Sequence, residues 1–169
     1  MNRIVLKYLI MAIGFAVVWI LIEHVLGFNT ARHEIGQYTR NATMIFFWVT
    51  IFLALRETKK NQGHQLSFMH GFMLGAMYSI LFSLAFVIVI LLYVKLINPA
   101  FYATYREFTL NQLIASHATP KAIKEAMHEV DMSYNGSMQS YVLLFLFSTL
   151  FGVFISLIAA FVYRTKSNA

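Results

Sequence analysis

The chain has no cysteine, only two prolines and few charged residues. Without cysteine, disulfides, thiolate metal ligands and cysteine nucleophiles are all excluded. Charged side chains make up 12% of the 169 residues and hydrophobic ones 59%, whereas ordinary soluble domains are about 25% charged. A water-soluble domain of this length does not hide so much apolar surface. The composition therefore indicates a membrane protein.

Charge is missing altogether from two long stretches, residues 61–94 and 132–163, which contain no Asp, Glu, Lys or Arg. A helix of about 20 apolar residues crosses a bilayer core about 30 Å thick, so both stretches are long enough to span it. We expect an all-α integral membrane protein with a single domain over residues 1–169. Its four transmembrane helices are expected at about these residues: 4–22, 38–55, 68–94 and 141–163.

The second of these segments is the shortest. Its apolar run, Ala42–Leu55, covers only about 21 Å as a helix, so spanning requires the helix to extend back through residues 36–41. A re-entrant or buried segment is the alternative.

The basic residues predict the orientation of the spans. Short segments on the side of both termini hold Arg3, Lys7, Arg56, Lys59, Lys60, Arg164 and Lys166, and the other side holds Arg32, Arg40, Lys95, Arg106, Lys121 and Lys124. Because positive charge in short flanking segments stays in the cytoplasm, we expect both termini there.

The net charge of +6 is spread around apolar segments, which favours lipid headgroups as its partner and argues against nucleic acid.

An outer segment joins the third and fourth spans, and we expect amphipathic helices over residues 99–134. Asn98-Pro99 should end the third span, because proline disfavours helix in the residue before it. Phe101, Tyr105 and Phe108 then recur at near-helical spacing, which predicts a helix lying on the bilayer surface. Thr119-Pro120 is typical of a helix start and Asn135-Gly136 of a helix end.

The second outer helix contains Glu125 and His128 in Glu-x-x-His spacing, which places a carboxylate and an imidazole on one helix face. Di-metal carboxylate proteins use this spacing, but with further ligands from facing helices. His117, Glu125 and His128 are therefore only weak candidates for a metal site. The favoured interpretation is a solvated helix face beside an apolar stripe, Ile123, Met127 and Val130, and no cofactor is expected.

Ionisable residues near the spans are few. Glu23 and His24 end the first span, where we expect water to reach them. The deep parts of the spans carry no acid or base that would relay a proton or coordinate an ion, which argues against an ion-coupled transporter built from one subunit.

Small residues recur every fourth position in two spans, a pattern that lets helix backbones approach closely in lipid. These packing residues are Gly71, Gly75, Ser79 and Ser83 in the third span and Ser148, Gly152, Ser156 and Ala160 in the fourth, with Ala12 and Ala16 in the first. Whether they pack within one chain or between chains stays open.

Five segments, taken in order, resemble a family of bacterial multipass membrane proteins named domain of unknown function four-one-nine-nine. They are "MNRIVLKY" at the start, "LSFMHGFMLG" (Leu66–Gly75), "INPAFYATY" (Ile97–Tyr105), "ATPKAIKEA" (Ala118–Ala126) and the basic end "VYRTK". The resemblance implies a four-helix inner-membrane protein with an outer helical loop, and it supplies no catalytic residues.

The leading functional hypothesis is a structural or accessory membrane protein without enzymatic activity, whose outer loop contacts a partner or the lipid bilayer. A homo-oligomer or a complex with another membrane protein would fit this role. One alternative is a small oligomeric transporter or channel, with Ser79, Ser83, Ser148 and Ser156 along a path between subunits. The other is a metalloenzyme using His117, Glu125 and His128.

Overall fold

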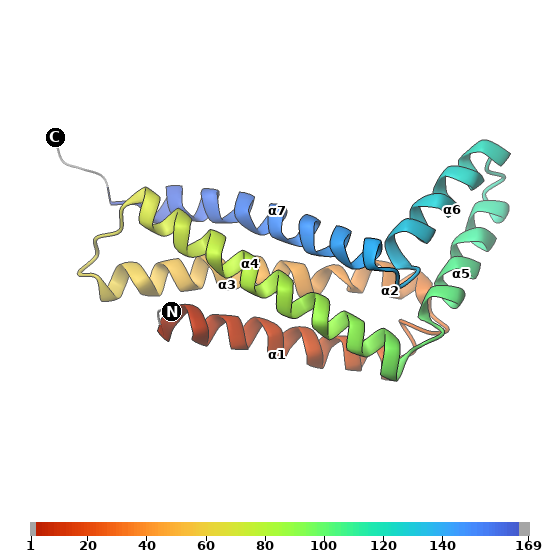
Figure 1. Ribbon diagram of the computed structural model, residues 1–169, viewed down its shortest axis with the longest axis horizontal. Coiled ribbons are helices and arrows are strands. Elements are labelled where there is room, and N and C mark those ends of the chain that lie inside the picture. Colours follow the sequence, from red (N-terminus) through yellow and green to blue (C-terminus); the bar gives the residue numbers. More distant parts are fainter. Residues whose placement is uncertain (1–2, 166–169) are drawn as a thin grey trace.

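The computed structural model describes residues 3–165, which fold into helices with no strand among them. In chain order the elements are α1 (Arg3–Val25), α2 (His33–Thr39), α3 (Asn41–Asn61), α4 (Phe68–Leu92), the π-helical turn η1 (Tyr93–Ile97), α5 (Phe101–Ala115), α6 (Pro120–Tyr134) and α7 (Met138–Tyr163). The long helices α1, α3, α4 and α7 lie side by side as a bundle (Figure 1). The expected all-α class is confirmed.

Four helical segments within residues 3–165 are long and apolar enough to cross a membrane: Arg3–Val25, His33–Asn61, Phe68–Ile97 and Met138–Tyr163. The second span was expected at residues 38–55, and α3 continues past it to Asn61, with Lys59 and Lys60 placed favourably at the negative end of its dipole. At its other end α2 and α3 meet at Arg40, whose backbone is itself helical (φ −54°, ψ −30°). The short apolar run is thus part of a segment long enough to span.

The outside of the bundle is strongly apolar. On α4 and α7 the exposed large side chains include Met73, Leu84, Leu150, Phe154 and Phe161. Soluble monomers rarely expose contiguous apolar patches of more than a few hundred Å². This surface is therefore suited to lipid, in agreement with the membrane assignment.

Helices α4 and α7 form the most extensive contact in the molecule, and their small residues lie in it. A Cβ atom on Gly71 would lie 3.4 Å from Cβ of Ala160, and Oγ of Ser79 is 3.3 Å from Oγ of Ser156. Ser83, Ser148 and Gly152 are buried as well. These packing stripes therefore join two helices of one chain.

The other two bundle helices complete the core. Ala12 and Ala16 of α1 are buried, and α1 contacts α3 and α4. Phe47 of α3 stacks on Phe82 of α4 with ring centroids 3.9 Å apart. Between α4 and α1, the hydroxyl of Tyr78 donates to the backbone carbonyl of Tyr8.

Helices α5 and α6 form a hairpin at the end of the bundle opposite to the start of α1 and the end of α7 (Figure 1). Its expected boundaries are confirmed: Oγ1 of Thr119 accepts a hydrogen bond from the Ala122 backbone N–H with Pro120 as the first helical residue, and α6 ends at Asn135-Gly136. Gly136 has φ +70°, a left-handed conformation that glycine adopts at little cost. The hairpin leans away from the bundle axis, toward the α7 side.

Candidate functional site

Glu23, near the end of α1, is buried at the hairpin end of the bundle with 1% of its surface exposed. Its carboxylate accepts hydrogen bonds from Oγ1 of Thr39 at 2.5 Å and from Nδ2 of Asn29 at 3.2 Å. The expectation that water reaches Glu23 is therefore wrong. The turn after α1 folds back and brings two donors onto the carboxylate, which replace its hydration.

The polar network extends from Asn29 to the end of α4. Nδ2 of Asn98 donates to the Asn29 backbone carbonyl at 2.8 Å and to the hydroxyl of Tyr93 at 3.1 Å. That hydroxyl also lies 3.1 Å from Nδ1 of His24. These bonds fasten the α1–α2 loop to the π-helical turn that precedes the hairpin.

Arg40, at the junction of α2 and α3, is held by aromatic rings of the hairpin. Its guanidinium carbon lies 4.4 Å from the ring centroid of Tyr105, 5.4 Å from that of Phe101 and 5.9 Å from that of Tyr134. Its Nε donates to the carbonyl of Gly36 at 3.0 Å. Cation–π contacts of this kind are stronger where water is excluded, so Arg40 joins the hairpin to the bundle.

The aromatic stripe of α5 also packs around His33 of α2. The rings of Phe101, Tyr105 and Phe108 all lie with centroids within 6 Å of the His33 ring, and Nε2 of His33 is 2.9 Å from Oγ1 of Thr104. We expected this stripe to lie on the bilayer surface. In the structure these rings face protein, because His33 of α2 and Arg40 at the α2–α3 junction pack against them.

The two hairpin helices are pinned together by Asp131 of α6. Its Oδ1 accepts from the hydroxyl of Tyr102 at 2.7 Å and from Nε of Arg106 at 3.0 Å, both on α5. These bonds lower the pKa of the Asp131 carboxyl, with the Tyr102 hydrogen bond as the main cause. They correspondingly raise the pKa values of Tyr102 and Arg106.

A cavity of about 270 Å³ lies next to Glu23 and Arg40 and is lined by residues of the bundle and of the hairpin. Three buried polar atoms of its lining residues have no hydrogen-bond partner within residues 3–165: Asn29 Oδ1, Arg40 Nη2 and Tyr141 OH. The cavity therefore combines an apolar lining with a cationic donor, an acceptor and a hydroxyl.

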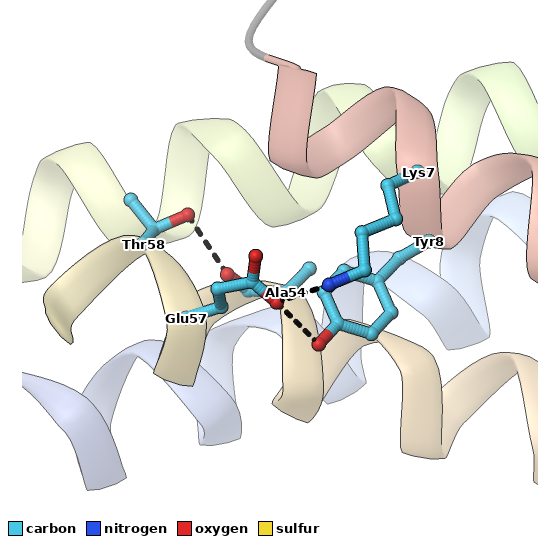
Figure 2. Close-up of polar contacts among 5 residues, drawn as sticks. All are labelled: Lys7, Tyr8, Ala54, Glu57 and Thr58. Atoms are coloured by element: carbon cyan, nitrogen blue, oxygen red, sulfur yellow. Dashed lines mark hydrogen bonds and ion pairs between the residues drawn. The ribbon is translucent and has the colours of Figure 1, made fainter. Parts of the chain in front are cut away.

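The opposite end of the bundle carries a second polar cluster, shown in Figure 2. Oε2 of Glu57 on α3 receives hydrogen bonds from Nζ of Lys7 and from the hydroxyl of Tyr8 on α1, each at 2.7 Å. Nearby, Oγ1 of Thr58 donates to the Ala54 carbonyl of its own helix. A hollow of about 670 Å³ beside this cluster is rich in basic residues: Arg56, Lys59, Lys60 and His64.

The weak metal candidates are not assembled into a site. No group of three His, Asp or Glu side chains within the described part of the chain is placed to hold a metal ion. Glu125 instead lies 3.9 Å from the ammonium of Lys121 one turn away. Glu125 and His128 are exposed on α6, while Met127 and Val130 of its apolar stripe are buried. The interpretation of a solvated helix face fits this arrangement.

The serines proposed for a path between subunits lie in the contact between α4 and α7. Ser79, Ser83, Ser148 and Ser156 are all buried there. Three of them donate to a carbonyl four residues earlier in their own helix, at 2.7 to 2.8 Å. Their hydroxyls thus face the interior of one chain, away from any surface that a second subunit would share.

Sequence reasoning missed Asn29, Arg40 and Tyr141 as cavity residues. Arg40 carried a signal, because an arginine at the end of a span that must extend past it needs a partner inside the protein. Asn29 lies in a loop and Tyr141 in an aromatic-rich span, and neither position differs from ordinary structural residues in sequence.

Residues 8–165 match the family described as "Protein of unknown function (DUF4199)". Because the match covers nearly the whole chain, this protein belongs to that family. This bears out the resemblance seen in the five sequence segments. No curated protein and no solved structure matches the chain.

Proposed function

We propose that this protein is a structural or accessory component of the bacterial inner membrane, without enzymatic activity, and that its α5–α6 hairpin contacts a partner protein. The observation that carries the proposal is the way the hairpin is held. Its aromatic rings pack on Arg40 and His33 and the apolar stripe of α6 is buried, so the outward face of α6 is polar.

The outward face of α6 carries charges of both signs. Lys121, Lys124, Glu125, His128 and Glu129 are all exposed. Burying such side chains in lipid is costly, which favours a position in the aqueous phase. Mixed charge on a rigid support suits a protein surface of complementary charge, since electrostatic complementarity provides orientation and specificity.

The orientation that we propose places both termini and the Lys7–Glu57 cluster in the cytoplasm. Basic side chains concentrate in short segments at this end: Arg3, Lys7, Arg56, Lys59, Lys60 and Arg164. Glu57 is the acidic residue among them. The positive-inside rule then leaves the hairpin on the outer side.

Site-specific photo-crosslinking in native membranes tests the partner. A benzophenone amino acid replaces Lys124 or His128, and the matched control places it at Met73, which is exposed on the apolar surface of α4. We expect a crosslinked protein from the hairpin positions, and a clearly lower yield of crosslinked protein from position 73. Two differently tagged copies show whether the captured protein is a second copy of this chain. Equal or absent protein capture at all three positions would refute the proposal.

A further inference from the structure

The cavity next to Glu23 and Arg40 is divided into an apolar part and a polar part. Its apolar lining includes Ile20, Met44, Phe86, Ile90 and Leu144, and its polar lining includes Glu23, Arg40 and Tyr141. Each pair on one helix is separated by about one turn: Ile20 precedes Glu23, Met44 follows Arg40, and Leu144 follows Tyr141. The apolar part therefore lies deeper in the bundle, and the polar part lies under the hairpin.

The polar part contains buried groups that lack partners within residues 3–165. Asn29 is 3% exposed, and its Oδ1 has no hydrogen-bond partner, although its Nδ2 donates to Glu23. Nη2 of Arg40 and the hydroxyl of Tyr141 are in the same condition. A buried polar group without a partner costs about 1–3 kcal/mol, and most buried polar groups in native proteins are paired. Three such atoms around one cavity indicate a ligand with a polar head.

The charge of the head follows from the groups that remain free. Both carboxylate oxygens of Glu23 already accept hydrogen bonds, from Thr39 and Asn29. Within the described residues no carboxylate forms an ion pair with Arg40, whose guanidinium packs on aromatic faces and donates from Nε to the Gly36 carbonyl. Because a guanidinium binds carboxylates and phosphates with strong, directional hydrogen bonds, the free group selects an anionic oxygen.

We propose that this cavity binds a single-chain amphiphile whose head carries a carboxylate or phosphate. Arg40 and Tyr141 donate to the anionic oxygens, Asn29 accepts from a hydroxyl of the head, and the chain lies along Met44, Ile90 and Leu144. The volume of about 270 Å³ is near the lower limit of small-molecule pockets, about 300 Å³. This small volume favours one chain over two as the occupant. This inference is independent of the proposed partner of the hairpin.

Photoaffinity labelling in phosphatidylcholine nanodiscs tests the site. The probes carry a diazirine on the chain: palmitate as the carboxylate and lysophosphatidate as the phosphate, which distinguish the two head chemistries. Palmityl alcohol, with a neutral head, and phosphatidylglycerol, with two chains, are the matched controls. We expect one or both single-chain anions to label peptides containing Met44, Ile90 or Leu144, in competition with the unlabelled compound.

Substitutions show whether the labelling depends on the proposed contacts. Arg40→Gln removes the cation and should raise the half-saturating probe concentration roughly ten- to a hundredfold. Tyr141→Phe removes one hydroxyl and should raise it a few-fold, while Leu144→Trp fills the apolar part and should abolish specific labelling. Arg106→Gln changes an arginine that pairs with Asp131 outside the cavity, and it should leave labelling unchanged.

Two results would overturn the proposal: equal labelling by the alcohol or the two-chain lipid, and labelling by the anions that is unchanged in both Tyr141→Phe and Leu144→Trp. These two variants also decide the question if Arg40→Gln does not fold.

Discussion

Gly75 of α4 and Ser156 of α7 lie so close that a Cβ atom on Gly75 would be 2.6 Å from both Cβ and Oγ of Ser156. The relation is reciprocal one step along the helices, since a Cβ on Gly152 of α7 would lie 2.7 Å from Cβ of Ser79. Each glycine thus leaves room for the serine side chain of the other helix, which packs against it. Close backbone approach of this kind is the main source of helix association in lipid, where hydrophobic burial contributes little.

Gly75→Ala should therefore destabilise the bundle by about 1–3 kcal/mol, the usual cost of overpacking. Ser156→Gly in the same chain removes the opposing Cβ and should restore part of the loss. Gly14→Ala is the matched control, because a Cβ there would meet nothing within 4 Å. Thermal unfolding in mild detergent measures all three. Equal midpoints for Gly75→Ala and Gly14→Ala would contradict the interlocked packing.

Replacing Glu23 with alanine should destabilise the protein by about 1–3 kcal/mol, because Thr39 and Asn29 would each lose a buried acceptor. Glu34→Ala removes an exposed acid from the next helix and serves as the control. Urea or thermal unfolding of the two variants provides the comparison. If Glu23→Ala loses no more stability than Glu34→Ala, the hydrogen bonds of Glu23 make no net contribution to the free energy of unfolding.

The hairpin should loosen in acid. Tyr102 and Arg106 lower the pKa of Asp131 in the folded chain, so its contribution to stability is present above the ordinary carboxyl pKa and is lost as the pH falls through the lowered one. Hydrogen exchange of α5 and α6 amides across the acidic range measures this opening. Asp131→Asn should be less protected at neutral pH and show less acid dependence. If Asp131→Asn shows the same acid dependence of exchange as the unmodified chain, another group causes that dependence.

The pKa of Tyr102 is raised by the same hydrogen bond. The stability of the hairpin should therefore also fall at alkaline pH. A group with a raised pKa stabilises the folded state below its ordinary pKa, and this contribution is lost as the pH rises through the folded value. Tyr102→Phe should remove the alkaline dependence of hairpin exchange. Tyr38→Phe changes a largely exposed tyrosine of α2 and is the control. It should leave the alkaline dependence of hairpin exchange unchanged.

Single-cysteine labelling checks the proposed orientation directly, because the chain has no cysteine of its own. A membrane-impermeant maleimide should label Glu125→Cys on intact cells and should reach Lys60→Cys only after permeabilisation. Both positions are exposed. The reverse pattern would place the termini outside.

Local sequence signals predicted the helix boundaries well where a side chain caps its own helix. Thr119 and Pro120 start α6, Asn135-Gly136 ends it, and Asn98 follows the last turn before the hairpin. The second span was expected to end before Arg56, while the helix that contains it runs on to Asn61. A charged residue is compatible with a helix at a membrane surface, so charge alone does not mark its end.

The sequence by itself determined the class of protein and its long helices, because hydropathy and capping are properties of a single segment. It also predicted that Gly75 and Ser156 permit close approach. Only the tertiary structure decided that the approach occurs within one chain, that Glu23 is buried, and that Arg40 lies under aromatic rings beside a cavity. The partners involved are far apart in the chain, as with Thr39 for Glu23 and Tyr105 for Arg40. Their meeting depends on how the helices pack, which no local pattern encodes.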